Sequence, residues 1–271
     1  MNGFQTLSNP RLIVGISLFT ALLLFILLTP TVSRNKPNEI DLLHIELPPS
    51  QEHWFGTDSL GRDILARTAA GGKISLAVGI AATGIRTLIA VLLGFAAGFS
   101  KKADAVLMRV IDVLLCFPFY VLALSVMVFL GNSLINLILV IAFFTFAPSA
   151  RLIRTEVLAI KDRAFIQICR INGESAVRIL FGHIVPLLRN TIAVIFTTSV
   201  AQAVLMESSL SFLGMGIQEP QASWGSMLSV TLDIMNIGTK WYTWLPAGLC
   251  IILMTYSVHL IGEGFRELPR R

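Results

Sequence analysis

The chain has 271 residues, of which 55% are hydrophobic and 14% are charged, whereas soluble domains carry about 25% charged residues. These proportions exclude an ordinary water-soluble globule, so most of the chain is expected to lie in lipid. The net charge of +5 is the basic excess typical of cytoplasmic loops, and no basic block interleaved with aromatic residues indicates a nucleic-acid partner.

Six apolar runs are long enough to cross a bilayer, which requires about 20 residues of helix. The first run has no signal-peptide cleavage site after it and is expected to stay as an anchor. The chain is therefore predicted to be an all-α polytopic membrane protein with six transmembrane helices. The runs cover residues 11–31, 74–99, 105–130, 133–150, 187–207 and 242–262.

The distribution of Lys and Arg predicts the orientation of these spans. Most of the 21 basic residues fall in segments that lie in the cytoplasm if the amino terminus does, as the positive-inside rule requires. In the first outside loop, acids balance the bases. We expect both termini in the cytoplasm, an anchor helix and external loop in residues 1–72, and a membrane domain in residues 73–271.

Residues 151–186 are predicted to form a helical hairpin in the cytoplasm. Val157, Leu158, Phe165 and Ile168 recur at helical spacing in its first helix. Asn172-Gly173 then supplies a carboxyl-terminal stop, and Glu174 and Ser175 offer starts for a second, amphipathic helix. An apolar helical face exposed to the cytoplasm needs a partner surface.

The residues that carry enzyme chemistry are scattered. The four histidines lie in different segments and form no metal-binding motif, and no complete phosphate-binding loop is present. The cysteines Cys116, Cys169 and Cys250 are far apart, so neither a disulfide framework nor a zinc site is expected, and Cys169 is interpreted as a small buried apolar side chain. No catalytic, cofactor-binding or metal-binding residue is assigned.

Three ionisable residues fall inside or beside predicted spans: Arg86, Asp112 and Glu207. Such residues are costly in lipid and usually face a bundle interior or a water path. Asp112 and Glu207 are therefore candidates for a translocation pathway or its gate. The structural alternative places Asp112 near the inner interface, neutralised by Arg109 or Lys102, and places Glu207 at a helix end near the outer surface.

Four motifs carry a resemblance to a known family. They are the outside stretch His53-Trp54-Phe55-Gly56-Thr57-Asp58-Ser59-Leu60-Gly61-Arg62-Asp63, then Arg109-x-x-Asp112 with Phe117-Pro118, then Glu207-Ser208-Ser209-Leu210 with Trp224-Gly225, and finally Gly262-Glu263-Gly264-Phe265-Arg266-Glu267. Together they resemble the inner-membrane permease subunit of a binding-protein-dependent ABC importer for dipeptides, oligopeptides and nickel or metal chelates. The first stretch is similar to the family signature through Gly56, Thr57, Asp58, Gly61, Arg62 and Asp63.

The resemblance assigns a role to the cytoplasmic hairpin. Permeases of this family carry an E-A-A-x-x-x-G loop that docks on an ATPase subunit, and Gln167-Ile168-Cys169 here replaces Glu-Ala-Ala while Gly173 is retained. The resemblance thus implies an ATPase-coupling segment made of Phe165, Ile166, Gln167, Ile168, Cys169, Arg170, Gly173 and Glu174. It also implies a second permease subunit, two ATPase subunits that bind the ATP, and an extracytoplasmic binding protein.

The resemblance predicts a permease of the type I ABC importer fold that carries small peptides across the bacterial inner membrane, with nickel or a metal chelate as the alternative substrate. A secondary transporter is a remote alternative, because such proteins show inverted repeats and no convincing repeat is found. A membrane enzyme would need the reactive cluster that the sequence lacks.

Overall fold

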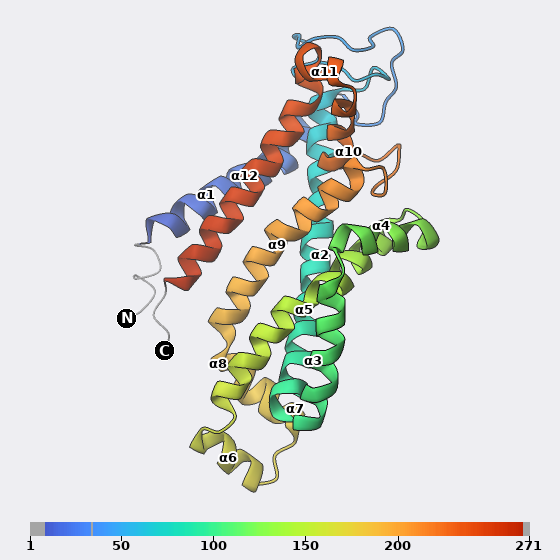
Figure 1. The fold of residues 1–271 in the computed structure, drawn as a ribbon. Helices are drawn as coiled ribbons and strands as arrows, with labels where there is room; N and C mark the ends of the chain where they lie inside the picture. The colour runs from blue at the N-terminus through green and yellow to red at the C-terminus, as the bar shows by residue number, and fades with distance from the viewer. Residues whose placement is uncertain (1–8, 34, 268–271) are drawn as a thin grey trace.

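A computed structural model describes residues 9–33 and 35–267, and every regular element in these two ranges is a helix. Five helices are long and apolar enough to cross a membrane. They are α1 (Pro10–Val32), α2 (Ile64–Phe99), α5 (Leu134–Ile160), α9 (Arg189–Phe212) and α12 (Trp241–Arg266). The all-α membrane fold predicted from hydropathy is confirmed (Figure 1).

The third predicted span is wrong as a single helix. It consists of α3 (Lys101–Cys116) and α4 (Phe119–Leu130), which meet at an angle of 90°. The corner lies at Phe117 and Pro118, where Phe117 is extended with φ −94° and ψ 135°. Proline lacks a backbone donor and disfavours a helical conformation in the residue before it, so the helix ends there.

The other spans differ from their predicted bounds mainly in length. Helix α2 begins at Ile64 because Asp63 caps its first turn, accepting a hydrogen bond from Ala66 N. The charged residues Arg67 and Lys73 lower the hydropathy of the first turns, so the predicted span began only at residue 74. Helix α5 continues through Pro148 to Ile160. It therefore contains Val157 and Leu158, which were assigned to the hairpin's first helix.

The hairpin that follows α5 is correspondingly shorter than predicted. Its helices are α6 (Ala164–Ile171) and α7 (Ala176–Ile179), and α7 runs into the π-helix η1 (Leu180–Ile184) and α8 (Val185–Leu187). The predicted stop at Gly173 and the predicted start at Ser175 are both confirmed, because Gly173 has φ +76° and Ser175 caps α7. We call this extremity of the molecule the hairpin end.

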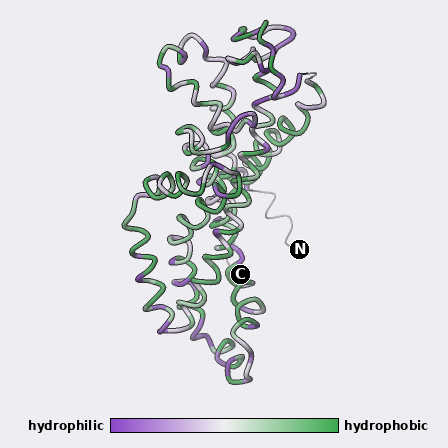
Figure 2. The backbone as a smooth tube through the Cα atoms, turned by 90° about the vertical axis from the view of Figure 1, so that its right-hand side faces the viewer, coloured by the Kyte–Doolittle hydropathy of each residue, from purple (hydrophilic) through white to green (hydrophobic). Residues whose placement is uncertain are grey.

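The opposite extremity, the loop end, contains the segment between α1 and α2 and the segment between α9 and α12 (Figure 1). The second segment holds α10 (Trp224–Leu228), the 3₁₀ helix η2 (Ser229–Leu232) and α11 (Ile234–Thr239). Figure 2 shows hydrophobic residues along the long helices and hydrophilic residues gathered mainly at the two ends. This is the distribution expected of a protein that spans a bilayer.

The most extensive contact in the bundle joins α2 and α5. It depends on small residues, because a Cβ at Gly94 would lie 2.7 Å from the backbone oxygen of Ala150, and one at Gly98 would lie 2.6 Å from Val157 Cγ1. Small residues let helices approach closely in lipid, where no hydrophobic force drives them together. Helices α1 and α12 pack on each other and join the bundle through α9 and α2.

Candidate functional site

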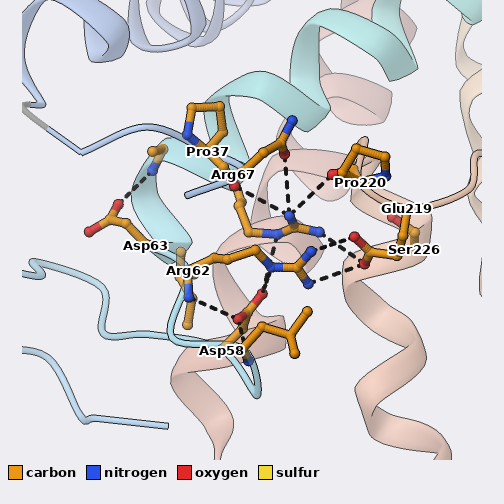
Figure 3. Close-up of polar contacts among 12 residues, drawn as sticks. Pro37, Asp58, Arg62, Asp63, Arg67, Glu219, Pro220 and Ser226 are labelled. Carbon is orange, nitrogen blue, oxygen red and sulfur yellow. Dashed lines mark hydrogen bonds and ion pairs between the residues drawn. The ribbon is translucent and has the colours of Figure 1, made fainter. Parts of the chain in front are cut away.

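The signature stretch at the loop end forms an ionic cluster around two buried arginines (Figure 3). Arg62 donates from Nε to Asp58 Oδ2 at 2.8 Å and also pairs with Glu219. Arg67 lies 3.2 Å from Glu219 Oε1 through Nη2 and 3.4 Å from Asp58 Oδ2 through Nε. Two guanidinium groups thus share two carboxylates, which offsets the cost of burying like charges together.

This cluster joins parts of the chain that are far apart in sequence. Arg62 and Glu219 are separated by 157 positions, and Arg67 also donates to the carbonyl oxygens of Pro37 and Pro220. Burial opposes the charge on Arg62, but hydrogen bonds to Glu219 and Asp58 more than compensate and raise the pKa of Arg62. We call these four charged residues, Asp58, Arg62, Arg67 and Glu219, the ionic clamp.

The rest of the signature shapes the loop itself. Asp63 Oδ1 caps α2, while its Oδ2 accepts from Asn35 and contacts His53 Nδ1, each at 2.9 Å. Thr57 donates to His44 O at 2.6 Å and accepts from Leu47 N at 2.8 Å. Gly61 has φ +72°, and a Cβ there would lie 1.7 Å from Asp41 O, so only glycine fits. Gly56, with φ +82°, also meets backbone, at Leu47 O.

Glu207 does not end its helix near the outer surface, as the structural alternative expected. It lies within α9 with 0% of its surface exposed, and its carboxylate accepts hydrogen bonds from Ser75 Oγ at 2.8 Å and Ser211 Oγ at 2.7 Å. Ser75 Oγ also accepts from the backbone N of Trp224 at 3.3 Å. Glu207 thereby connects α9, α2 and α10, and its candidate pathway role stays a prediction.

Asp112 is exposed on α3 and pairs with Arg151 on α5, so the expected partners Arg109 and Lys102 are wrong. The sequence offered no signal for this pair, which joins α3 to α5 across 39 positions of the chain. Arg86 is buried on α2, where it donates to Gln202 Oε1 and Ser149 Oγ, each at 3.1 Å. Among the residues that the structure describes, Arg86 Nε has no hydrogen-bond partner.

The predicted coupling segment forms α6 and the turn after it. Gly173 N donates to Arg170 O at 3.1 Å and Glu174 N donates to Cys169 O at 3.0 Å. These two bonds, with the positive φ of Gly173, make a complete Schellman motif. Within the segment, Ile166 is buried, Gln167, Cys169 and Glu174 are half-buried, and the others are exposed: Phe165, Ile168, Arg170 and Gly173.

The fold brings together the signature residues, but it keeps them far from the coupling segment, which lies at the other end of the molecule (Figure 1). Sequence reasoning missed Arg67 and Glu219, which complete the ionic clamp. His183, with Ile179 and Pro186, fits the I-x-x-x-H-x-x-P pattern that follows the coupling loop in the family, but its approach to Cys169 and Glu174 was not predicted. Sequence spacing alone gave no sign of either grouping, because each joins segments whose distance is set by the fold.

Known proteins resemble this chain over most of its length. Residues 87–267 match the family described as the binding-protein-dependent transport system inner membrane component. The chain belongs to this family. The permease is 35% identical to a putative peptide permease protein of Brucella suis biovar 1 over 262 residues, which cover 96% of this chain and 87% of that protein.

Two further relatives are of the same kind. The permease is 35% identical to the oligopeptide transport system permease protein OppC of Bacillus subtilis over 261 residues, covering 96% of this chain and 85% of the relative. A putative peptide transport system permease protein of Brucella suis biovar 1 is 32% identical over 255 residues, covering 94% and 86%. The resemblance based on the motifs is thus confirmed: the chain is an ABC importer permease.

Family membership fixes the general setting of the permease. It is a multi-pass membrane component of a transport system. Such a system includes a substrate-binding protein and ATPase subunits, so the permease is the membrane-spanning part of a larger assembly.

Proposed function

We propose that this permease forms part of a translocation path for small peptides across the inner membrane, together with a second, similar permease subunit. Two ATPase subunits bind at the hairpin end, on the cytoplasmic side with both termini, and a binding protein docks at the loop end. The chain itself binds no ATP, which is bound by the ATPase subunits. The names of the peptide permeases that resemble it favour peptides over nickel as the substrate.

The observation that carries this proposal is an apolar surface at the hairpin end. Ile171 is 82% exposed and Val177 is 66% exposed, although both lie on helices outside the spanning segments. Phe165, Ile168 and Phe181 are also exposed. An apolar patch of this kind in water is typical of a protein interface, and the ATPase subunits are the partners that would act on this side.

The hairpin is attached firmly to the spanning helices. Ile166 and Ile179 are buried against Val157 and Ile160 of α5 in one hydrophobic cluster. Arg170 lies over the ring of Phe99 at the end of α2, 4.7 Å from the ring centroid. A displacement of the hairpin by a bound ATPase would therefore be carried into α5 and α2 as a movement of packed elements.

The pair of Asp112 and Arg151 supports the position of the path. Both side chains are about half exposed on this chain, on α3 and α5. Ionisable groups at membrane depth face a bundle interior or a water-filled cavity rather than lipid. We place this pair at the face shared with the second permease subunit, where it lines the path or its gate.

The coupling role is tested by replacing Gly173 with valine. No atom would contact a Cβ at Gly173 within 4 Å, so the substitution acts only through its φ of +76°. Left-handed backbone costs an L-residue roughly 1–2 kcal/mol, which is expected to disturb the Schellman motif while the protein still inserts. We expect peptide uptake to fail, with uncoupled ATP hydrolysis or loss of the ATPase subunits on co-purification.

Gly131→Val is the matched control, because Gly131 has φ +79° and equally open surroundings, at the end of α4. Its ψ of 160° lies in a region that is almost exclusive to glycine, so valine should cost at least as much backbone energy there, and coupling should stay intact. Normal uptake and normal co-purification in Gly173→Val would show that the hairpin is only a connection. Uptake assays in vesicles with peptides and with nickel decide the substrate, and uptake of nickel alone would contradict the peptide assignment.

A further inference from the structure

We propose that Cys169, Glu174 and His183 form a three-ligand site for a divalent cation of the zinc class within the hairpin. One ligand atom from each residue lies within 4.8 Å of the other two. Cys169 Sγ is 3.5 Å from His183 Nε2, and His183 Nε2 is 3.1 Å from Glu174 Oε2. Two of the three residues, Cys169 and Glu174, belong to the predicted coupling segment, and Cys169 stands where the family loop has alanine.

The spacing of these atoms fits a tetrahedral ion. Zinc binds sulfur at about 2.3 Å and nitrogen or oxygen at about 2.1 Å. In a tetrahedral site, these bond lengths place a sulfur ligand about 3.6 Å from a nitrogen ligand, and a nitrogen ligand about 3.4 Å from an oxygen ligand. The two distances in the hairpin differ from these values by only a few tenths of an ångström. Cys169 Sγ and the Glu174 carboxylate oxygen lie within 4.8 Å of each other, and a bound ion would bring them to about 3.6 Å.

The backbone holds the three residues in place. In a Schellman motif, the third-last helical residue and the second residue after the cap lie side by side, and they commonly make a hydrophobic contact. Here these positions are Cys169 and Glu174, a thiol and a carboxylate, and the bond from Glu174 N to Cys169 O is 3.0 Å. His183 approaches from η1, a π-helix, and such helices frequently occur at functional sites.

The chemistry of the donors selects the metal. Thiolate and imidazole together favour zinc over magnesium or calcium, which prefer oxygen ligands. Three protein ligands leave the fourth position open, as in zinc sites that keep a water or accept a group from a partner. Burial and the carboxylate of Glu174 raise the pKa of the Cys169 thiol, so in the absence of a cation the group stays protonated, and a bound cation would displace that proton.

One neighbouring charge opposes the cation. Arg178 Nε lies 3.9 Å from Glu174 Oε2, but its side chain is 76% exposed and free to turn into solvent. Glu174 and His183 are only half-buried, so an ion can enter from the aqueous side. A bound ion would connect the end of α6 to η1 and would stiffen the surface that we propose for ATPase docking.

The test uses the purified full-length permease and zinc alone, without ATPase partners, so its outcome does not depend on the proposed function. We expect equimolar zinc to bind, to protect Cys169 from alkylation, and to be removed by a chelator with return of the reactive thiol. Cobalt in place of zinc should produce a sulfur-to-metal charge-transfer band. Cys169→Ser should abolish this band and the zinc binding, whereas Cys116→Ser, which removes an exposed cysteine elsewhere, should leave both unchanged.

Glu174→Gln separates a metal site from a simple hydrogen-bonded triad. Glutamine keeps an acceptor for His183 but is a poor zinc ligand, so a metal site predicts weaker zinc binding in this variant. Alkylation of Cys169 at the same rate with and without zinc would overturn the proposal. So would zinc binding that survives Cys169→Ser and Glu174→Gln in protein that elutes like the parent.

Discussion

At the scale of single residues, the ionic clamp shows how motif residues act through partners that the motif does not contain. Asp58 and Arg62 belong to the signature stretch, but Glu219 lies on another segment and completes the neutralisation of both arginines. A sequence pattern reveals residues that act together locally. It gives no sign of Glu219, because the pairing is made by the packing of two loops on the ends of α2 and α9.

The clamp predicts an order of stability among its acid variants. The side chain of Asp58 is mostly buried and also accepts a hydrogen bond from the backbone N of Arg62. Asp58→Asn removes the negative charge beside two buried guanidinium groups, so we expect it to lower the free energy of unfolding by about 3 kcal/mol. Glu219 is 60% exposed, and Glu219→Gln should cost about 1 kcal/mol. Thermal unfolding of the purified variants measures this order.

Glu39→Gln provides the control, since Glu39 is an exposed acid of the same loop. Its unfolding midpoint should match that of the parent. An unfolding midpoint for Asp58→Asn equal to that of Glu39→Gln would mean that the clamp contributes nothing to stability.

The ion pair between His44 and Asp41 predicts a pH dependence. Their Nδ1 and Oδ2 atoms are 2.7 Å apart, and this hydrogen bond raises the pKa of His44 and lowers the pKa of Asp41. Because the pKa of His44 is raised, the ion pair stabilises the fold fully at pH values below the ordinary histidine pKa, and this stabilisation is lost as the pH rises through the raised pKa. Because the pKa of Asp41 is lowered, its stabilisation is full at pH values above the ordinary aspartate pKa and is lost as the pH falls through the lowered pKa. The pair therefore contributes most between about pH 3.9 and about pH 6.5.

Asp41→Asn should return the pKa of His44 towards its ordinary value. An NMR titration of the labelled imidazole in the parent and in Asp41→Asn measures the change. The titration of His44 in Glu39→Gln, which changes an exposed acid of the same loop that does not shift the pKa of His44, serves as the control. An unaltered His44 titration would show that the pair does not form in solution.

At the scale of elements, hydropathy located the spanning segments but not their ends or their shape. The turn of α2 before residue 74 contains charged residues, and its start is fixed by the Asp63 cap. The corner between α3 and α4 had a local signal in Phe117-Pro118, but proline also occurs within α1, α5 and α12, where the helix continues. Only packing decides which proline ends a helix, so sequence reasoning could not separate these cases.

The contact between α2 and α5 predicts opposite effects for two glycines of one helix. A Cβ at Gly94 would lie 2.7 Å from the backbone oxygen of Ala150, so Gly94→Ala must push the helices apart, at a cost of about 1–3 kcal/mol. Gly84 has no atom within 4 Å of its Cβ position, and Gly84→Ala should gain up to about 1 kcal/mol from helix propensity. Thermal unfolding in detergent compares the two, and equal midpoints would contradict the tight helix contact.

At the scale of the whole molecule, the orientation proposed from basic residues can be read out with single cysteines. Ser50 is exposed at the loop end and Asp162 is exposed at the hairpin end. In a chain with its three cysteines replaced, a membrane-impermeant thiol reagent should label Ser50→Cys in intact cells stripped of any outer barrier. Asp162→Cys should be labelled only after the inner membrane is broken. The reverse pattern would invert the topology.

Helix α5 is long enough that a small rotation at one end produces a larger displacement at the other end. Its 27 residues run from Leu134, just after α4, to Ile160 at the start of the hairpin, a length of about 40 Å at about 1.5 Å per residue. If such a rod pivots by about 5° at the hairpin, its far end sweeps about 3.5 Å. Pro148 removes one backbone hydrogen bond near the middle of α5, so we expect the helix to bend there if the proposed coupling moves the hairpin.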